Sequence, residues 1–242
     1  MISEIRIAEL LAPFLDQTSA RALCTRDLIY ISTYIDILLR WNTRISLTAI
    51  RDPVEIITRH FGESLFAARV LFPEKSHCAP RMGDADLRVD GPASLAPRRI
   101  TVADLGSGAG FPGIPIKLWV PLVDLTLVES NQKKVAFLRE VVRALTLTNV
   151  NVYPGRAERL AVSISNPQDP AHGFEIVTLR AVEHFAKVLP TALSLAVVQA
   201  RLALMIGRSQ LGEALAITSV RWNSPLEIPL SNSRLLLIGT KL

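Results

Sequence analysis

The sequence predicts an α/β fold, with a doubly wound, mostly parallel sheet behind an N-terminal helical region. Three observations predict it. Apolar residues recur with a helical period through the first 72 residues. From residue 100 onward, strand-like runs alternate with helix-like segments, which is the pattern of a parallel sheet with helices on both faces. A glycine-rich turn joins the first of these strands to the helix that follows it.

Composition narrows the class of protein. The chain has 242 residues, 49% of them hydrophobic, which is enough for a full core and excludes a disordered chain. Cys24 and Cys78 are far apart and no Cys-x-x-Cys occurs, so we expect neither a disulfide framework nor a metal site. Glu4 and Glu9 stand where an export signal would be basic, and no apolar run approaches a membrane span. We therefore expect a cytoplasmic protein without membrane association. A monomer is expected as well, although the sequence does not determine the oligomeric state. Its net charge of +5 is compatible with a nucleic-acid partner and does not require one.

The helical region is predicted to span residues 1–72. Its helices are expected over residues 1–15, over 26–41 and from Asp52 to about Leu71. Asp52 is a good N-cap, and Pro53 suits the first helical position. Residues 73–99 contain four prolines and almost no periodic apolar residues, so they are predicted to form an insertion or linker that the fold can lose.

The ligand-binding domain is predicted to span residues 100–242. In this domain predicted strands alternate with predicted helices. A further apolar stretch and one antiparallel closing strand follow them. The expected strands are 100–105, 123–128, 150–153, 174–178 and the closing 235–238; the expected helices are 112–120, 131–145, 157–164 and 182–198; the apolar stretch is 202–206.

The most informative segment is the glycine loop, VADLGSGAGFPGIP, over residues 102–115. Gly106, Gly108 and Gly110 let the backbone turn sharply and approach a ligand without interference from a Cβ. Such a loop, between a strand and a helix, is where α/β sheets bind ligands. Asp104, at the end of the strand, is expected to point its carboxylate towards the pocket.

Two cofactors fit the loop. Read from Gly108, the loop matches G-x-G-x-x-G, and Glu129 lies at the distance that a dinucleotide site requires, which suggests an NAD(P)-dependent oxidoreductase. Read from Gly106, the first glycine after the strand, it gives D-x-G-x-G-x-G, the pattern of S-adenosylmethionine (SAM) sites. In that reading Glu129 accepts the protons of the ribose diol, although it can also be a helix-capping acid.

Several motifs together carry a family resemblance. They are DLGSGAGFPGIPIKL, LVESNQKKVAFLREVV, GRAE, VTLRAV and the earlier WN-x-x-x-x-LT that begins at Trp41. This combination resembles the RsmG (GidB) family of bacterial small-subunit (16S) ribosomal RNA guanine-N7 methyltransferases. The resemblance implies a Rossmann-like SAM-dependent methyltransferase fold with an N-terminal helical extension, SAM as the cofactor, and small-subunit ribosomal RNA, free or in the assembled subunit, as the partner.

The resemblance also implies which residues contact SAM. They are Gly106, Phe111, Glu129, Ser130, Asn131, Ala157, Glu158 and Arg180. Ala157 and Glu158 follow the third strand, where the adenine is held in such sites. Arg180 follows the fourth strand and is expected to face the pocket as a ligand of the cofactor or of RNA phosphate. Lys133 and Lys134, in the first turn of a helix, either contact RNA phosphate or form ordinary solvated surface.

No catalytic residue is predicted, because guanine N7 carries a lone pair and no proton, so its attack needs no general base. Among the histidines, His60 is the best candidate for a functional role. Two positions depart from the family pattern: Ser46 replaces an asparagine, and Ile206 replaces a lysine. Both changes remove polar groups from the expected substrate side. The second hypothesis is therefore a catalytically weak or inactive RNA- or ribosome-binding protein on the same fold, and the oxidoreductase, which lacks an evident catalytic pair, is the third.

Overall fold

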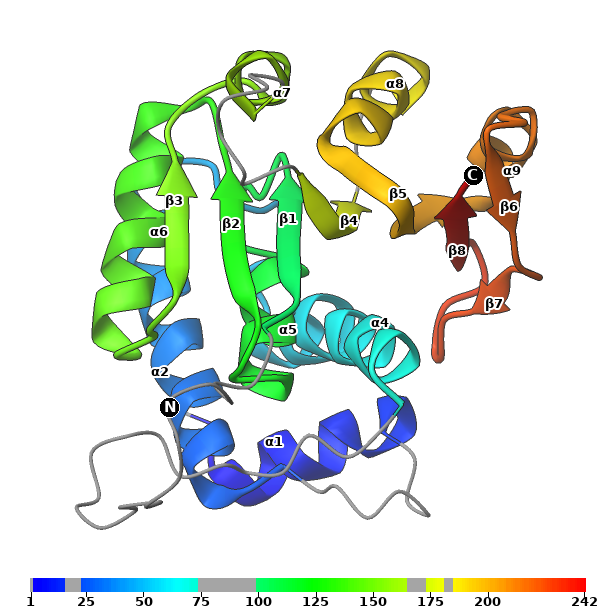
Figure 1. Ribbon diagram of the computed structural model, residues 1–242. Coiled ribbons are helices and arrows are strands. Elements are labelled where there is room, and N and C mark those ends of the chain that lie inside the picture. The colour runs from blue at the N-terminus through cyan, green and yellow to red at the C-terminus, as the bar shows by residue number, and fades with distance from the viewer. Residues whose placement is uncertain (1, 16–22, 74–98, 165–172, 181–184) are drawn as a thin grey trace, which may run out of the picture.

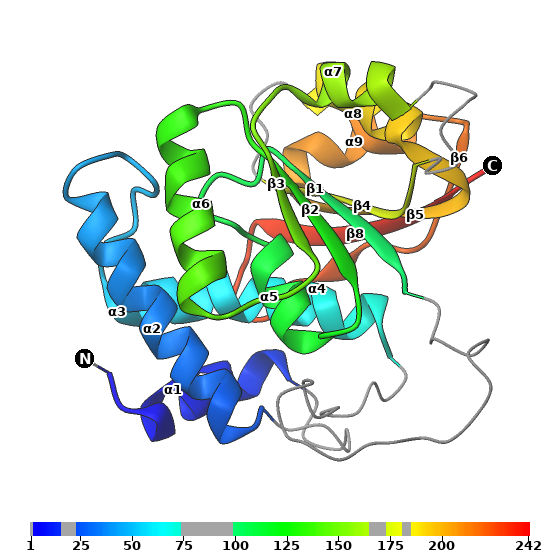
Figure 2. The same ribbon diagram turned by 60° about the vertical axis from the view of Figure 1, so that its left-hand side comes forward.

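The alternation of strand and helix patterns after residue 99 produces one mixed sheet with helices on both faces (Figures 1 and 2). The computed structural model describes residues 2–15, 23–73, 99–164, 173–180 and 185–242. Within these ranges the sheet has eight strands in the order β3-β2-β1-β4-β5-β8-β6, and β7 pairs with β8 beside this path.

The first five strands are parallel and confirm the predicted sheet. They are β1 (Thr101–Leu105), β2 (Asp124–Val128), β3 (Val150–Tyr153), β4 (Phe174–Arg180) and β5 (Ala196–Gly207). The predicted closing strand is β8 (Arg234–Lys241), which is antiparallel to β5. Two short strands were not predicted, β6 (Val220–Trp222) and β7 (Leu226–Glu227). The strand order reverses between β1 and β4, and ligands of open α/β sheets bind at the carboxyl ends of the strands at such a point.

The helices of this part are α5 (Gly113–Trp119), α6 (Gln132–Ala144), α7 (Ala157–Ile164), α8 (Phe185–Leu195) and α9 (Leu211–Leu215). The first four correspond to predicted helices. The expected end of the helix over 182–198 is wrong, because Ala196 already begins β5. Val197 and Val198 are β-branched residues that favour a strand, and Ala196 already pairs with Phe174 of β4.

The N-terminal region forms α1 (Glu4–Leu11), η1 (Ala12–Phe14), α2 (Thr25–Asn42), α3 (Pro53–Glu55), η2 (Ile56–Gly62) and α4 (Glu63–Leu71). Asp52 caps the third predicted helix, since its carboxylate accepts a hydrogen bond from the Glu55 amide at 3.2 Å. That helix is not uniform, because η2 is a π-helical stretch. Such stretches are rare and often occur at functional sites.

Two hydrophobic clusters cover the two faces of the sheet. One contains α1, α2, α4, α5 and α6, so that Tyr34 of α2 and Leu127 of β2 belong to a single core. The other contains α7, α8 and α9. Figure 2 shows the two helical layers on opposite sides of the strands. The predicted linker at 73–99 lies outside the described residues, apart from Pro73 and Arg99. Within the described ranges, no helix is both long and apolar enough to cross a membrane.

Candidate active site

The glycine loop follows β1 at the carboxyl edge of the sheet, beside the reversal of strand order. Its φ angles are positive at Gly106 (+67°), Gly108 (+56°) and Gly110 (+85°), a conformation that other residues rarely adopt. The amides of Gly106 and Ser107 donate to the Val128 carbonyl at 2.9 and 3.0 Å, which fixes the loop to the end of β2. A Cβ on Gly106 would meet no atom within 4 Å. The backbone at Gly106 therefore borders open space, where a ligand can lie directly against it.

The carboxylate of Asp104 is buried and bonds to groups of the protein. The expectation that it faces a pocket was wrong. The side chain is 1% exposed; its Oδ2 accepts from the Gly113 amide at 3.1 Å, and its Oδ1 accepts from Thr178 Oγ1 at 2.8 Å. Burial raises the pKa of Asp104 to about 6. The residue joins the end of β1 to the start of α5 and to β4, and so sets the shape of the loop.

Glu129 lies directly after β2 and links the glycine loop to the start of α6. Its Oε2 accepts from the Gly108 amide at 2.9 Å, and its Oε1 accepts from the Asn131 amide at 2.7 Å. A carboxylate offers about four acceptor positions, so each oxygen can still accept a hydroxyl proton from a ligand. The geometry thus shows the anchor near a helix start, and the contact between Glu129 and a ligand stays a prediction.

Replacing Glu129 by alanine is expected to weaken SAM binding by about 1–3 kcal/mol, because ligand hydroxyls and the Gly108 amide lose their acceptor. Isothermal titration of the variant with SAM measures this. Glu213→Ala, which removes an exposed acid on α9, is the matched control and should bind normally. A dissociation constant unchanged by Glu129→Ala would leave this residue only its structural role.

The other predicted cofactor contacts of β2 and β3 lie at the same edge of the sheet. Asn131 is the N-cap of α6, where its Oδ1 accepts from the amides of Lys133 and Lys134 at 3.0 and 3.3 Å. Ser130 precedes it and is exposed. Ala157 and Glu158 begin α7 after β3, with Glu158 exposed. The carboxyl ends of β1, β2 and β3 therefore bring these residues to one side of the glycine loop.

Phe111 is packed inside the protein. Its ring is 7% exposed and lies between those of Tyr34, at a centroid distance of 5.3 Å, and His60, at 4.8 Å. The Tyr34 hydroxyl donates to the carbonyl of Ala109 in the same loop. Aromatic stacking and this hydrogen bond attach the N-terminal helices to the glycine loop. The predicted contact between Phe111 and SAM stays a prediction, and the ring's observed partners are aromatic side chains.

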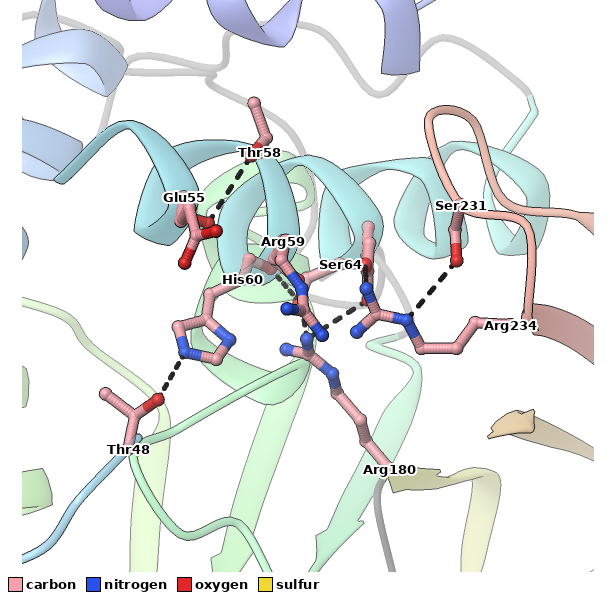
Figure 3. Close-up of polar contacts among 10 residues, drawn as sticks. Thr48, Glu55, Thr58, Arg59, His60, Ser64, Arg180, Ser231 and Arg234 are labelled. Carbon is pink, nitrogen blue, oxygen red and sulfur yellow. Dashed lines mark hydrogen bonds and ion pairs between the residues drawn. The ribbon is translucent and has the colours of Figure 1, made fainter. Parts of the chain in front are cut away.

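The WN-x-x-x-x-LT motif has a physical explanation. The Asn42 Oδ1 accepts from the amides of Leu47 and Thr48 at 2.9 and 3.1 Å, and its Nδ2 donates to the Thr48 carbonyl at 2.9 Å. Thr48 Oγ1 lies 2.8 Å from His60 Nε2 (Figure 3). Burial and the Arg180 charge lower the pKa of His60 to about 3, so the ring is neutral when it stacks on Phe111. The motif thus holds His60 against the glycine loop.

Arg180 is the last residue of β4 and lies in a cluster that the sequence did not predict. Its guanidinium donates to the Arg59 carbonyl and to Glu63 Oε2, the latter at 3.1 Å, and it lies 5.9 Å from the centre of the Phe111 ring. Arg234 pairs with Glu63 Oε1 at 2.6 Å. Figure 3 shows Arg59, Arg180 and Arg234 converging from η2, β4 and β8. The available signal was Glu63 itself, the one acid in the segment 56–71.

Ile206 is not on the substrate side, and that expectation was wrong. The side chain is 4% exposed and belongs to the cluster under α7, α8 and α9. Side chains alternate between the faces of a strand, so Met205 faces the opposite cluster. Ser46 is exposed, in the loop that Asn42 holds. Ile206 therefore removes no polar group from the substrate side.

Comparison with known proteins identifies the family of this chain. The family described as GidB, rRNA small subunit methyltransferase G, matches residues 92–223. A protein named ribosomal RNA small subunit methyltransferase G from Chloroflexus aggregans is 35% identical over 217 residues, which cover 86% of this chain and 79% of that protein. A protein of the same name from Roseiflexus sp. (strain RS-1) is 38% identical over 178 residues, which cover 73% of this chain and 63% of that protein.

Among solved structures, a SAM-dependent methyltransferase from Aquifex aeolicus is 18% identical, with a TM-score of 0.48. The match covers 59% of this chain and 82% of that one. By the family match and the Chloroflexus relative, the chain belongs to the GidB (rRNA small subunit methyltransferase G) family.

Proposed function

We propose that this protein transfers a methyl group from SAM to N7 of a guanine in small-subunit ribosomal RNA. The observation that carries the proposal is the open backbone at Gly106, which borders free space at the reversal of strand order and lies beside the Glu129 carboxylate. Relatives that share at least 35% of their aligned residues with the chain are named as methyltransferases of small-subunit ribosomal RNA.

The residues at this edge fit SAM. A Cβ at Gly106 would enter the space where the ligand would lie, and Glu129 retains acceptor positions for a ribose diol. The ends of β2 and β3 supply Ser130, Asn131, Ala157 and Glu158 for the rest of the cofactor. When bound, SAM supplies an electrophilic methyl group on a sulfonium.

The chain's own residues position the reactants. Because N7 has no proton to lose, the reaction needs no general base, and catalysis rests on alignment and exclusion of water. The stack of Tyr34, Phe111 and His60 and the Tyr34 hydrogen bond to Ala109 would hold the glycine loop in place, and such a reaction requires fixed placement of its reactants. His60 is held in the neutral form and bonds to Thr48, which fits a positioning role.

The RNA must present its guanine outside a regular helix. In A-form RNA, N7 faces a groove too deep and narrow for protein side chains, so the target base is unpaired or flipped out. The hypothesis of an inactive RNA-binding protein loses part of its basis, because Ile206 belongs to the core.

The proposal is tested by incubating the protein with labelled SAM and a substrate from a strain that lacks this protein. The substrate is either the small ribosomal subunit or its free RNA. We expect label in small-subunit RNA and none in large-subunit RNA, the control. SAM binding without any transfer would favour the inactive RNA-binding protein. Binding of NADH without SAM would favour the oxidoreductase.

A further inference from the structure

Acidic and arginine side chains stand on two different sides of the site. Glu129 and Glu158 follow β2 and β3, on the side proposed for the cofactor. Arg180 ends β4 on the other side. Arg234 begins β8, which is antiparallel, and it pairs with Gly207 at the end of β5, so it lies at the same edge of the sheet as Arg180.

Glu63 forms ion pairs with the two arginines at the ends of β4 and β8. Its side chain is 3% exposed and is shared by the guanidinium groups of Arg180 and Arg234, whose side chains are 10% and 26% exposed. Arg59, one turn earlier on η2, is exposed and places its guanidinium beside these two (Figure 3). Among the described residues, no acidic side chain forms an ion pair with Arg59. Three arginines therefore surround one carboxylate, which leaves an excess of two positive charges.

The positive charges of these three arginines exceed what the Glu63 carboxylate neutralises. Burial, with the neighbouring charges of Arg234 and Arg59, lowers the pKa of Arg180 to about 10, although Glu63 opposes the shift. The pKa of Arg234 is lowered too, by burial and by Arg59. Like charges so close together repel each other, and an anion placed among them would relieve that repulsion.

We propose that Arg59 and Arg234, positioned by the Glu63–Arg180 pair, bind a phosphodiester of the RNA strand next to the target guanine; this rests on the function proposed above. A guanidinium presents a planar fork of donors that matches phosphate oxygens. The cluster adjoins the glycine loop, since Arg180 lies over the Phe111 ring. In this proposal the RNA backbone therefore lies on the side of β4 and β8, where Arg180 and Arg234 are placed.

The test is Arg59→Gln, because this side chain has no ion pair with a described residue and its loss leaves the Glu63 pairs intact. RNA binding is measured across a salt series, together with SAM affinity and thermal unfolding. We expect several-fold weaker RNA binding, a salt slope smaller by about 0.7–0.9, and unchanged SAM affinity. Arg6→Gln on α1, whose side chain is 55% exposed and pairs with Glu9, is the control and should change nothing.

The outcomes separate this inference from the proposed function. If the wild-type protein methylates RNA while Arg59→Gln retains normal affinity and salt slope, the phosphate site is wrong and the function stands. If the wild-type protein binds RNA without methylating it, the proposed function fails, while a reduced slope in Arg59→Gln still supports the site. Absence of salt-dependent RNA binding by the wild-type protein overturns the site as well.

Discussion

Gly106→Val is expected to abolish SAM binding while the protein stays folded. The backbone at Gly106 has a φ of +67°, which a β-branched residue adopts only at a cost. A Cβ there meets no atom of the protein, so the added methyl groups project into the space proposed for the cofactor rather than into the core. Isothermal titration with SAM and thermal unfolding of the variant measure the two effects separately.

The matched control is Gly212→Val on α9, where a Cβ also meets no atom within 4 Å. It should change stability little, since valine has a slightly higher helix propensity than the glycine it replaces, and it should leave SAM affinity unchanged. Near-normal SAM affinity in Gly106→Val would mean that the cofactor does not contact the loop at this position.

Glu63→Ala is expected to destabilise the protein by about 3–5 kcal/mol, because it leaves Arg180 buried without its carboxylate partner. Urea unfolding of the variant and of the wild-type protein gives this difference. Glu227→Ala is the control: it also removes the partner of an arginine, Arg208, but the two side chains are 72% and 52% exposed. Its cost should be below about 1 kcal/mol. Equal effects of the two substitutions would show that the buried cluster contributes no more than a surface pair.

The parallel sheet and its glycine loop could be predicted because their signals are local. Each of these signals is contained in a few neighbouring residues. They are the periods of strands and helices, the glycines after β1 and the Asp52 cap. The short strands β6 and β7 were missed because they depend on pairing with β8 and carry little apolar pattern of their own.

The basic cluster could not be predicted because its members come from distant parts of the chain. Arg180 and Glu63 are 117 residues apart in sequence, and the packing of η2 and α4 against one face of the sheet brings them together. Ile206 was misplaced for a related reason. Its face of β5 is set by register with β4 and β8, and a shift of one residue moves a side chain to the other face.

The most direct test of the account identifies the modified nucleoside. Small-subunit RNA from a strain that lacks the protein is incubated with the purified protein and SAM, digested to nucleosides and analysed by mass spectrometry. The account predicts new N7-methylguanosine that is absent when Gly106→Val replaces the wild-type protein. A methyl group on another atom, or no new modified nucleoside, would contradict it.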